Sequence, residues 1–150
     1  MRIVLQRARS GSVSVGDQEV SRIGKGVVIL LGIGTEDGNP DTAPGKIRFL
    51  VEKVVNLRIF DDDMGKMNRS LLEVGGEAIV VSQFTLYADT RKGRRPSYTD
   101  AAMPEYARPL VDRFVEELVR LGVPTQIGVF GAHMLVEIKN DGPVTIVLEK

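Results

Sequence analysis

The sequence contains no cysteine, no tryptophan and a single histidine, His133. The absence of cysteine excludes disulfides, thiolate nucleophiles and zinc–sulfur sites, and it fits a protein of the reducing cytoplasm. No apolar stretch approaches the length of about 18 residues that a membrane helix needs, and the N-terminus lacks the layout of a signal peptide. We therefore expect a cytoplasmic protein with no membrane-spanning segment.

An excess of charge of one sign is also missing. Twenty lysine and arginine residues are balanced by twenty aspartate and glutamate residues. No global field draws the chain to nucleic acid, so binding of a polyanion would have to use a local cluster of cations. With 150 residues, of which 43% are hydrophobic, the chain suits one domain, residues 1–150, with a single core.

Apolar periodicity predicts a mixed α/β fold. Helical spacing occurs over residues 42–55, with Asp41 as the N-cap, and over residues 104–121, with Gly122 just beyond the last turn. The predicted strands cover residues 2–7, 12–15 and 19–20 (a hairpin), 27–33, 57–60, 78–81, 125–129, 134–139 and 144–148. We expect a largely antiparallel or mixed sheet, barrel-like or layered, with residues 27–33 in its middle and two main helices covering it.

Residues 77–86, EAIVVSQFTL, change character halfway along. The first half is a β-branched apolar run, typical of a strand buried on both faces. The second half brings Ser82, Gln83 and Thr85 to the end of that strand, where each polar side chain needs a partner if it is buried. The pattern indicates a strand that ends in a pocket, although Ser82 and Thr85 could also mark the point where the strand leaves the core.

Four cations crowd a segment with glycine inside it and proline after it: Arg91, Lys92, Arg94 and Arg95. This composition predicts an irregular loop, for which backbone phosphates are natural partners. A solvated loop without a partner is the alternative.

Three consecutive carboxylates, Asp61, Asp62 and Asp63, stand two residues before Gly65. A calcium loop of the helix–loop–helix type needs a glutamate at its twelfth position, and counting from Asp61 this position is Leu72. We therefore expect a solvated turn and no metal site.

A hydrolase of the serine type needs a nucleophile, a base and an oxyanion site. Thr85 and Ser82 could serve as nucleophiles, but neither lies in a glycine-flanked nucleophile elbow. His133 could be the base, or it could be an ordinary exposed residue of the loop in which we place it. Residue chemistry alone leaves both questions open.

Two strings, Ser82–Leu86 (SQFTL) and Asn140–Thr145 (NDGPVT), resemble the two signature motifs of the D-aminoacyl-tRNA deacylase family. Other matches follow in the family's order and extend the resemblance over essentially the whole chain; they lie at Gln6-Arg7, Gly32, Arg58–Phe60, Gly65–Asn68 and Arg95–Ser97. The resemblance implies an enzyme that hydrolyses the ester between a D-amino acid and the terminal ribose of tRNA, without a cofactor.

In this family, main-chain N–H groups polarise the ester carbonyl, and the neighbouring ribose hydroxyl or a water completes the reaction. The resemblance makes Ser82, Gln83 and Thr85 the catalytic residues and Phe84 a residue of the substrate pocket. It also makes Phe130 an aromatic partner for the terminal adenine, since aromatic rings stack on unpaired bases. Ordinary core packing is the alternative for both phenylalanines.

The same resemblance implies that Gly142-Pro143, between two neighbouring strands, is a cis peptide inserted into the partner subunit's pocket. The protein would then be a homodimer, with Arg7 bracing the inserted segment unless it is a surface charge. A main-chain wall facing the amino acid would exclude L side chains and accept both D-aminoacyl-tRNA and mischarged glycyl-tRNA.

Two other functions remain open on the sequence. One is a non-catalytic tRNA-binding module that uses the basic loop. The other is a small-molecule esterase with Thr85 as its nucleophile.

Overall fold

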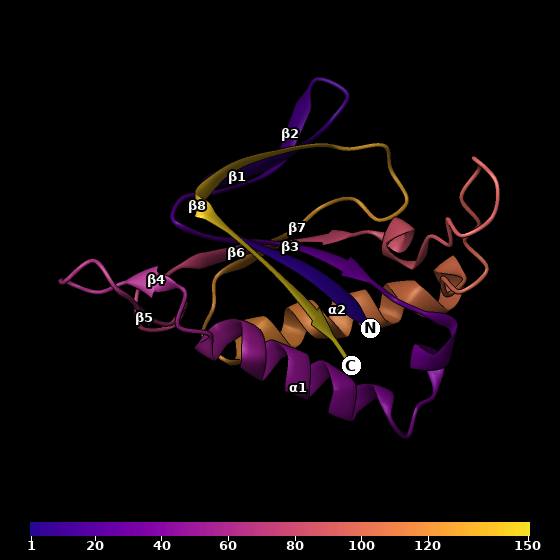
Figure 1. The fold of residues 1–150 in the computed structure, drawn as a ribbon, viewed down its shortest axis with the longest axis horizontal. Coiled ribbons are helices and arrows are strands. Elements are labelled where there is room, and N and C mark those ends of the chain that lie inside the picture. The colour runs from indigo at the N-terminus through magenta and orange to yellow at the C-terminus, as the bar shows by residue number, and fades with distance from the viewer.

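The long apolar run of the sequence forms strand β3 (Gly26–Gly32), and it lies in the middle of the sheet. In this computed structural model, which describes residues 1–150, the strand order is β2-β1-β3-β6-β7, and β8 pairs with β1 outside this path (Figure 1). The other strands are β1 (Arg2–Val15), β2 (Gln18–Ile23), β6 (Glu77–Ser82), β7 (Thr125–Ile127) and β8 (Leu135–Glu149). The predicted places of the central and edge strands are confirmed.

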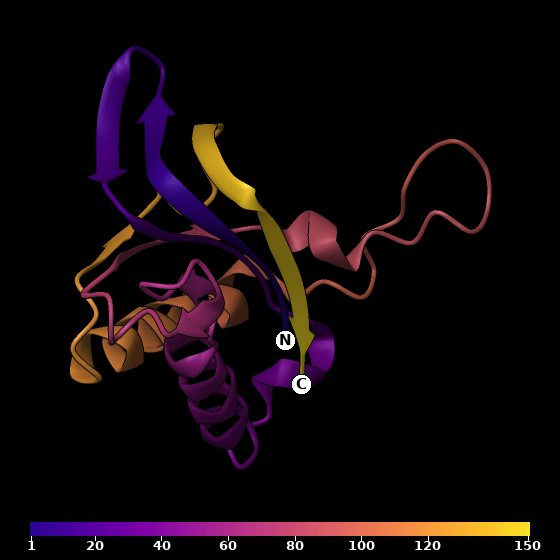
Figure 2. The ribbon, with the colours of Figure 1, turned by 60° about the vertical axis from the view of Figure 1, so that its left-hand side comes forward.

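The sheet is mixed, because β3, β6 and β7 run parallel while β1 is antiparallel to its three partners. The first half of β1 pairs with β3 and its second half with β2, and the sheet curves strongly between them (Figure 2). Its edges meet where the main-chain N–H and C=O of Arg22 both bond the side-chain amide of Gln126, at 2.9 and 2.6 Å. The predicted barrel-like, mixed sheet is confirmed as a nearly closed one.

Two helices, α1 (Ala43–Asn56) and α2 (Pro104–Arg120), cover one side of the sheet (Figure 1). Their apolar stripes share one core with side chains of β1, β3 and β6, as helical spacing requires. The helical members of this core are Ala43, Ile47, Leu50, Val51, Val54, Val55, Ala107, Leu110, Val111, Phe114 and Leu118. Neither helix is both long and apolar enough to cross a membrane.

The two helix boundaries depart from the prediction in one respect. Gly122 has a φ of 91° just beyond α2, which is the expected place for a glycine that ends a helix. Asp41, however, is not the N-cap of α1. The helix begins at Ala43, so Thr42 takes that position, and its side chain makes no capping bond.

The prediction of two neighbouring strands, 134–139 and 144–148, joined at Asn140–Pro143, is wrong. Both segments belong to β8, because β1 is long enough to pair with residues on both sides of the motif. The register of this ladder shifts twice between Gln6 and Ser10, opposite the motif. Proline has no N–H to give to a ladder, so an irregular stretch of this kind is where a strand tolerates it.

The predicted strand at residues 57–60 is also mostly wrong. Only a short strand β4 forms there, and it pairs with β5 in a small hairpin. Their bounds are Phe60–Asp61 and Met67–Arg69. Asp62 lies in the connecting turn, where its carboxylate accepts two main-chain N–H groups at 2.9 and 3.0 Å. The predicted turn is therefore present and is held by a local hydrogen-bonded carboxylate.

A substitution at Gly26 tests the parallel pairing of β3 with β6. A Cβ atom at Gly26 would lie 1.9 Å from the carbonyl oxygen of Glu77. Gly26→Ala should therefore separate the strands and lower the free energy of unfolding by about 3 kcal/mol or more. Gly45→Ala in α1, where the Cβ position is open, should instead raise it by about 0.5 kcal/mol. Denaturant unfolding measures both changes, and a Gly26→Ala protein as stable as wild type would contradict the close approach.

Candidate active site

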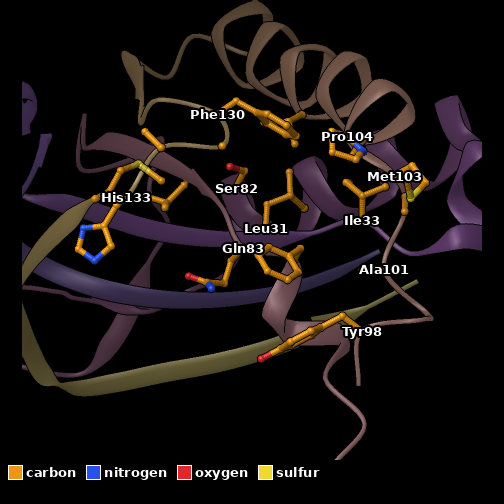
Figure 3. Close-up of a pocket in the computed structure, with 18 of the residues that line it drawn as sticks. Leu31, Ile33, Ser82, Gln83, Tyr98, Ala101, Met103, Pro104, Phe130 and His133 are labelled. Atoms are coloured by element: carbon orange, nitrogen blue, oxygen red, sulfur yellow. The ribbon is translucent and has the colours of Figure 1, made fainter. Parts of the chain in front are cut away.

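A pocket of about 540 Å³ lies where the three parallel strands end (Figure 3). Leu31 lies near the end of β3, Ser82 ends β6, and Phe130 follows β7. Ligand sites often form at the carboxyl ends of parallel strands, because the chain leaves the sheet there through loops that can carry functional groups. The prediction that the strand of residues 78–81 ends in a pocket is confirmed.

The pocket lining carries almost no charge. Fourteen of its nineteen residues are hydrophobic, and none is an aspartate, glutamate, lysine or arginine. The polar side chains come from Ser82, Gln83 and His133, and Tyr98 adds a hydroxyl to its apolar ring. Such a site suits a neutral, partly aromatic ligand group, and any reaction in it has to proceed without a carboxylate or an ammonium group from the lining.

Gln83 connects the end of β6 to the next element, the short 3₁₀ helix η2 (Phe84–Tyr87). Its main-chain N–H donates to the carbonyl of Leu31 at 2.8 Å, which continues the parallel ladder by one bond. Its side-chain amide donates to the hydroxyl of Thr85. Thr85 itself does not line the pocket, so it contacts the site only through Gln83.

No nucleophile–base pair is assembled in the pocket. No side chain other than the amide of Gln83 bonds the Thr85 hydroxyl, and His133 makes no hydrogen bond. His133 is exposed, as expected for a loop residue, and in Figure 3 its ring points away from Ser82. The geometry therefore provides no base for either predicted nucleophile.

Two aromatic residues flank the pocket mouth. The rings of Phe84 and Tyr98 meet edge to face, with centroids 5.0 Å apart, and the two residues are 56% and 39% exposed. Core packing therefore does not explain Phe84. Phe130 is half-buried and packs against the main core while also lining the pocket. Sequence analysis missed Tyr98 and Met103; the available signal was an aromatic residue just after the basic loop.

Arg7 is buried, with a residue exposure of 6%. Its Nε donates to the main-chain oxygen of Asp141 at 2.9 Å, and its Nη1 donates to the carbonyl of Ile59 at 2.5 Å and to Asp61 at 3.2 Å. The surface-charge alternative for Arg7 is therefore wrong. The guanidinium holds the chain beside Gly142-Pro143, a peptide bond that is cis, as predicted.

Both residues of the Gly142-Pro143 pair are exposed, and neither lines the pocket of its own chain. The neighbouring turn is held locally, since the side-chain oxygen of Asn140 accepts the N–H of Val144 at 3.0 Å. The motif is therefore a supported, exposed segment of β8 that lies outside the pocket of its own chain.

The basic segment forms a loop that projects from the body of the molecule (Figure 2). Main-chain bonds between Asp89 and Ser97 close its base. Arg91 pairs with Asp89 at 2.8 Å, and this pairing lowers the pKa of Asp89 to about 2. Lys92, Arg94 and Arg95 are exposed and have no carboxylate partner. Three cations of the predicted cluster are thus available to an external anion.

Comparison with solved structures supports the fold. A structure described as "c-Myc DNA Unwinding Element Binding Protein" matches with a TM-score of 0.91 at 40% identity, over 100% of this chain and 99% of the other. A second, described as a probable eukaryotic D-amino acid tRNA deacylase, matches with a TM-score of 0.82 over 98% of this chain and 97% of the other. At 20% identity, the second likeness shows the fold alone.

Comparison with curated sequences covers nearly the whole chain. A D-aminoacyl-tRNA deacylase of Roseiflexus sp. (strain RS-1) is 60% identical, over 99% of this chain and 93% of that protein. A D-aminoacyl-tRNA deacylase of Thermomicrobium roseum is 59% identical, over 99% of this chain and 94% of that protein. The model of the family described as D-Tyr-tRNA(Tyr) deacylase matches residues 4–149. The resemblance seen in the two motifs is confirmed, and the chain belongs to the D-Tyr-tRNA(Tyr) deacylase family.

Proposed function

We propose that the chain hydrolyses the ester bond of D-aminoacyl-tRNA, and of mischarged glycyl-tRNA, as a chirality check on translation in the cytoplasm. Membership of the family and the names of relatives up to 60% identical support this function. The observation that carries it is the pocket at the SQFTL end of β6, whose lining has no charged side chain. A neutral adenosine and an ester fit such a lining, whereas a phosphate group does not.

The chemistry that we propose relies on the main chain and on the substrate. The first N–H groups of a helix have no acceptor within it, so those at the start of η2 are suited to polarising an ester carbonyl. A water oxygen then attacks the carbonyl carbon, the bond to the ribose oxygen breaks, and that oxygen takes up the proton that the water loses, which releases the free amino acid. In a two-step variant, the neighbouring ribose hydroxyl first takes over the acyl group, and water then cleaves the new ester in the same way. Ser82 and Gln83 border the reacting group, and Thr85 orients the Gln83 amide.

The aromatic groups at the pocket mouth provide a place for the terminal adenine. Phe130 and Tyr98 lie on opposite sides of the pocket (Figure 3), and Phe84, which also lines it, meets Tyr98 edge to face. Stacking of a base on an aromatic side chain contributes about 1–3 kcal/mol, independently of sequence. This assignment fits a substrate whose last nucleotide is common to all tRNAs.

A deacylation assay on matched D- and L-aminoacyl-tRNA tests the function. We expect D-aminoacyl-tRNA and glycyl-tRNA to be hydrolysed and L-aminoacyl-tRNA to be rejected with large and small side chains alike, because a main-chain wall blocks the L direction for every side chain. Hydrolysis of D- and L-aminoacyl-tRNA at equal rates, or of neither substrate, would refute the proposal.

Thr85→Ala separates this function from a simple esterase. The Thr85 hydroxyl has no base beside it, so the variant should keep most of its turnover. Loss of a true nucleophile ordinarily costs several orders of magnitude in rate. A folded, tRNA-binding Thr85→Ala protein with no residual turnover would favour the esterase mechanism.

A nucleic-acid-binding module without turnover is the second candidate function. The projecting basic loop favours it, and so does the name of the 40% identical relative, which refers to binding DNA. This candidate predicts binding of uncharged tRNA together with stable D-aminoacyl-tRNA in the assay above. The two functions therefore differ in one measurable quantity, the release of free amino acid.

We also propose that the basic loop contacts tRNA phosphates, and salt dependence tests this. Replacing Lys92 and Arg94 by glutamine should flatten the log–log slope of tRNA affinity against salt by roughly 1.5, since each phosphate contact contributes about 0.7 to 0.9. A matched control neutralises Arg48 and Arg113, two exposed arginines of the helices, and should leave the slope unchanged. Equal slopes for the two double variants would show that the loop does not contact tRNA phosphates.

We further propose that the protein acts as a homodimer in which Gly142-Pro143 enters the partner's pocket and faces the amino acid. Both residues are exposed and lie outside their own chain's pocket, and Arg7 supports the segment from behind. Leu135 and Val147 of β8 are 63% and 68% exposed, which provides apolar surface for a second copy to cover.

The lack of cysteine makes this arrangement testable by cross-linking. We expect oxidation of a mixture of Pro143→Cys and Phe84→Cys proteins to give a disulfide-linked pair containing one chain of each, because Phe84 lies at the pocket mouth. Met64→Cys replaces Phe84→Cys in the control, since Met64 is 82% exposed and lies outside the pocket. A monomer by light scattering, or no linkage above this control, would contradict the proposed insertion.

A further inference from the structure

Asp37 is a buried carboxylate outside the pocket, in the 3₁₀ helix η1 (Thr35–Gly38) that follows β3. It is 2% exposed and accepts from the amino group of Met1 and from Lys46, both at 2.7 Å, and from the N–H of Gly34 at 2.8 Å. Burial disfavours its charge, but these donors together hold the pKa of Asp37 below its usual value. Because three donors bond this carboxylate, its position in the structure is well defined, and it can serve as a fixed point for other groups.

Tyr87, the last residue of η2, is bonded to this fixed point. Its hydroxyl donates to Asp37 at 3.2 Å, and the guanidinium of Arg2 lies 4.6 Å from the centre of its ring. Burial and the neighbouring carboxylate raise the pKa of Tyr87 far above its usual value, so the hydroxyl remains a donor at any working pH. Arg2 also donates to the carbonyl of Leu86 at 3.1 Å. The C-terminal end of η2 is thereby held by groups from two separate parts of the chain, β1 and η1.

The ring of Tyr87 and the main chain of Gln83 pack closely against the backbone at the end of β3. A Cβ atom at Gly34 would lie 2.6 Å from the ring of Tyr87, and one at Gly32 would lie 3.0 Å from the main-chain oxygen of Gln83. The ring of Tyr87 therefore rests on bare backbone. Its position determines that of the preceding turn, which carries Gln83 and Phe84 into the pocket.

The same short segment also holds the chain that returns from the basic loop. The N–H of Thr35 donates to the carbonyl of Asp100 at 3.0 Å, and the N–H of Ala102 donates to the carbonyl of Ile33 at 2.9 Å. Ala101 and Ala102 line the pocket. Residues 33–37 thus fix both the departure of the loop at Tyr87 and its return.

We infer that Tyr87 and Asp37 are a positioning pair for the reaction, which hold η2 so that the main-chain N–H groups at its start are aligned with the ester. The inference rests on the proposed deacylation. Neither residue lines the pocket, so the pair acts through η2 and not by touching the substrate. A displacement of about 1 Å in an aligned group can lower the rate by up to a hundredfold. Loss of the Tyr87 hydroxyl can therefore lower kcat measurably even though it does not touch the substrate.

Tyr87→Phe tests the inference, because it removes the hydroxyl and keeps the ring in contact with the backbone of Gly32 and Gly34. We expect kcat for D-aminoacyl-tRNA to fall roughly tenfold while KM changes less than about twofold, since the tRNA body is bound elsewhere. We also expect faster hydrogen exchange at the amides of Gln83, Leu86 and Ala88, whose bonds fix the turn. Asp37→Asn should shift the same amides in the same direction.

Tyr106→Phe is the matched control, because Tyr106 is a 63% exposed tyrosine on α2 outside the pocket. The inference would be overturned if the Tyr87→Phe protein had the same kcat as the Tyr106→Phe protein, or if hydrogen exchange at the three amides were unchanged. A uniform rise in exchange with unchanged kcat per folded molecule would also overturn it, because that is the signature of a merely structural role. If the wild-type protein releases no amino acid, the proposed function fails, while amide exchange still decides whether the pair positions η2.

Discussion

In the parallel ladder between β3 and β6, Leu31 stands opposite Ser82, and the next main-chain bond joins Gln83 back to Leu31. This pairing places the two strand ends side by side, and the pocket exists because the chain leaves the sheet at that common edge. The pairing begins with the close approach of Gly26 to Glu77, which only a residue without a Cβ atom permits. A shift of one residue would turn Ser82 to the other face and bury a polar group among apolar ones.

The pocket that results is unusual for a hydrolase in the groups that it lacks. No charged side chain lines it, and its one histidine makes no hydrogen bond. An ester is activated enough to be cleaved by correctly placed dipoles, so a site of this kind depends on position more than on the acidity of its side chains. In the proposed mechanism, the contacts around η2 take on this role, because the buried ion pairs of Asp37 support the end of η2 from outside the pocket.

A buried arginine, Arg7, supports the other motif. Its guanidinium satisfies its charge with two carbonyl oxygens and with Asp61, and it thereby ties β1 to β8 and to the chain before β4. An arginine suits this role because its planar group donates in several directions at once. Removal of these bonds would leave the segment at Gly142-Pro143 with its local bonds, the exposed Arg9–Asp141 pair and the flanking ladder to β1. In the proposed dimer, the two motifs of one sequence would meet across two chains.

The sequence by itself determined the class of fold, the two helices, the central and edge strands and the family. Each of these depends on local periodicity or on strings of adjacent residues, which need no knowledge of distant contacts. It also indicated a pocket at the end of β6, because Ser82 and Gln83 break an apolar run. It could not determine that residues 134–139 and 144–148 form one strand, since only the length of β1 decides that.

Tertiary structure alone decided which polar groups share a site. Thr85 is two residues from Gln83 in sequence yet lies outside the pocket, because η2 turns its side chain back toward the Gln83 amide. Tyr98 joins the pocket from beyond an exposed loop; an aromatic residue after that loop is visible in the sequence, but its contact with Phe84 is not. Arg7 is buried because carbonyl groups far along the chain converge on it. The physical reason is the same in each case: the partners that satisfy or orient a side chain are set by how distant segments pack, whereas a sequence pattern reports only near neighbours.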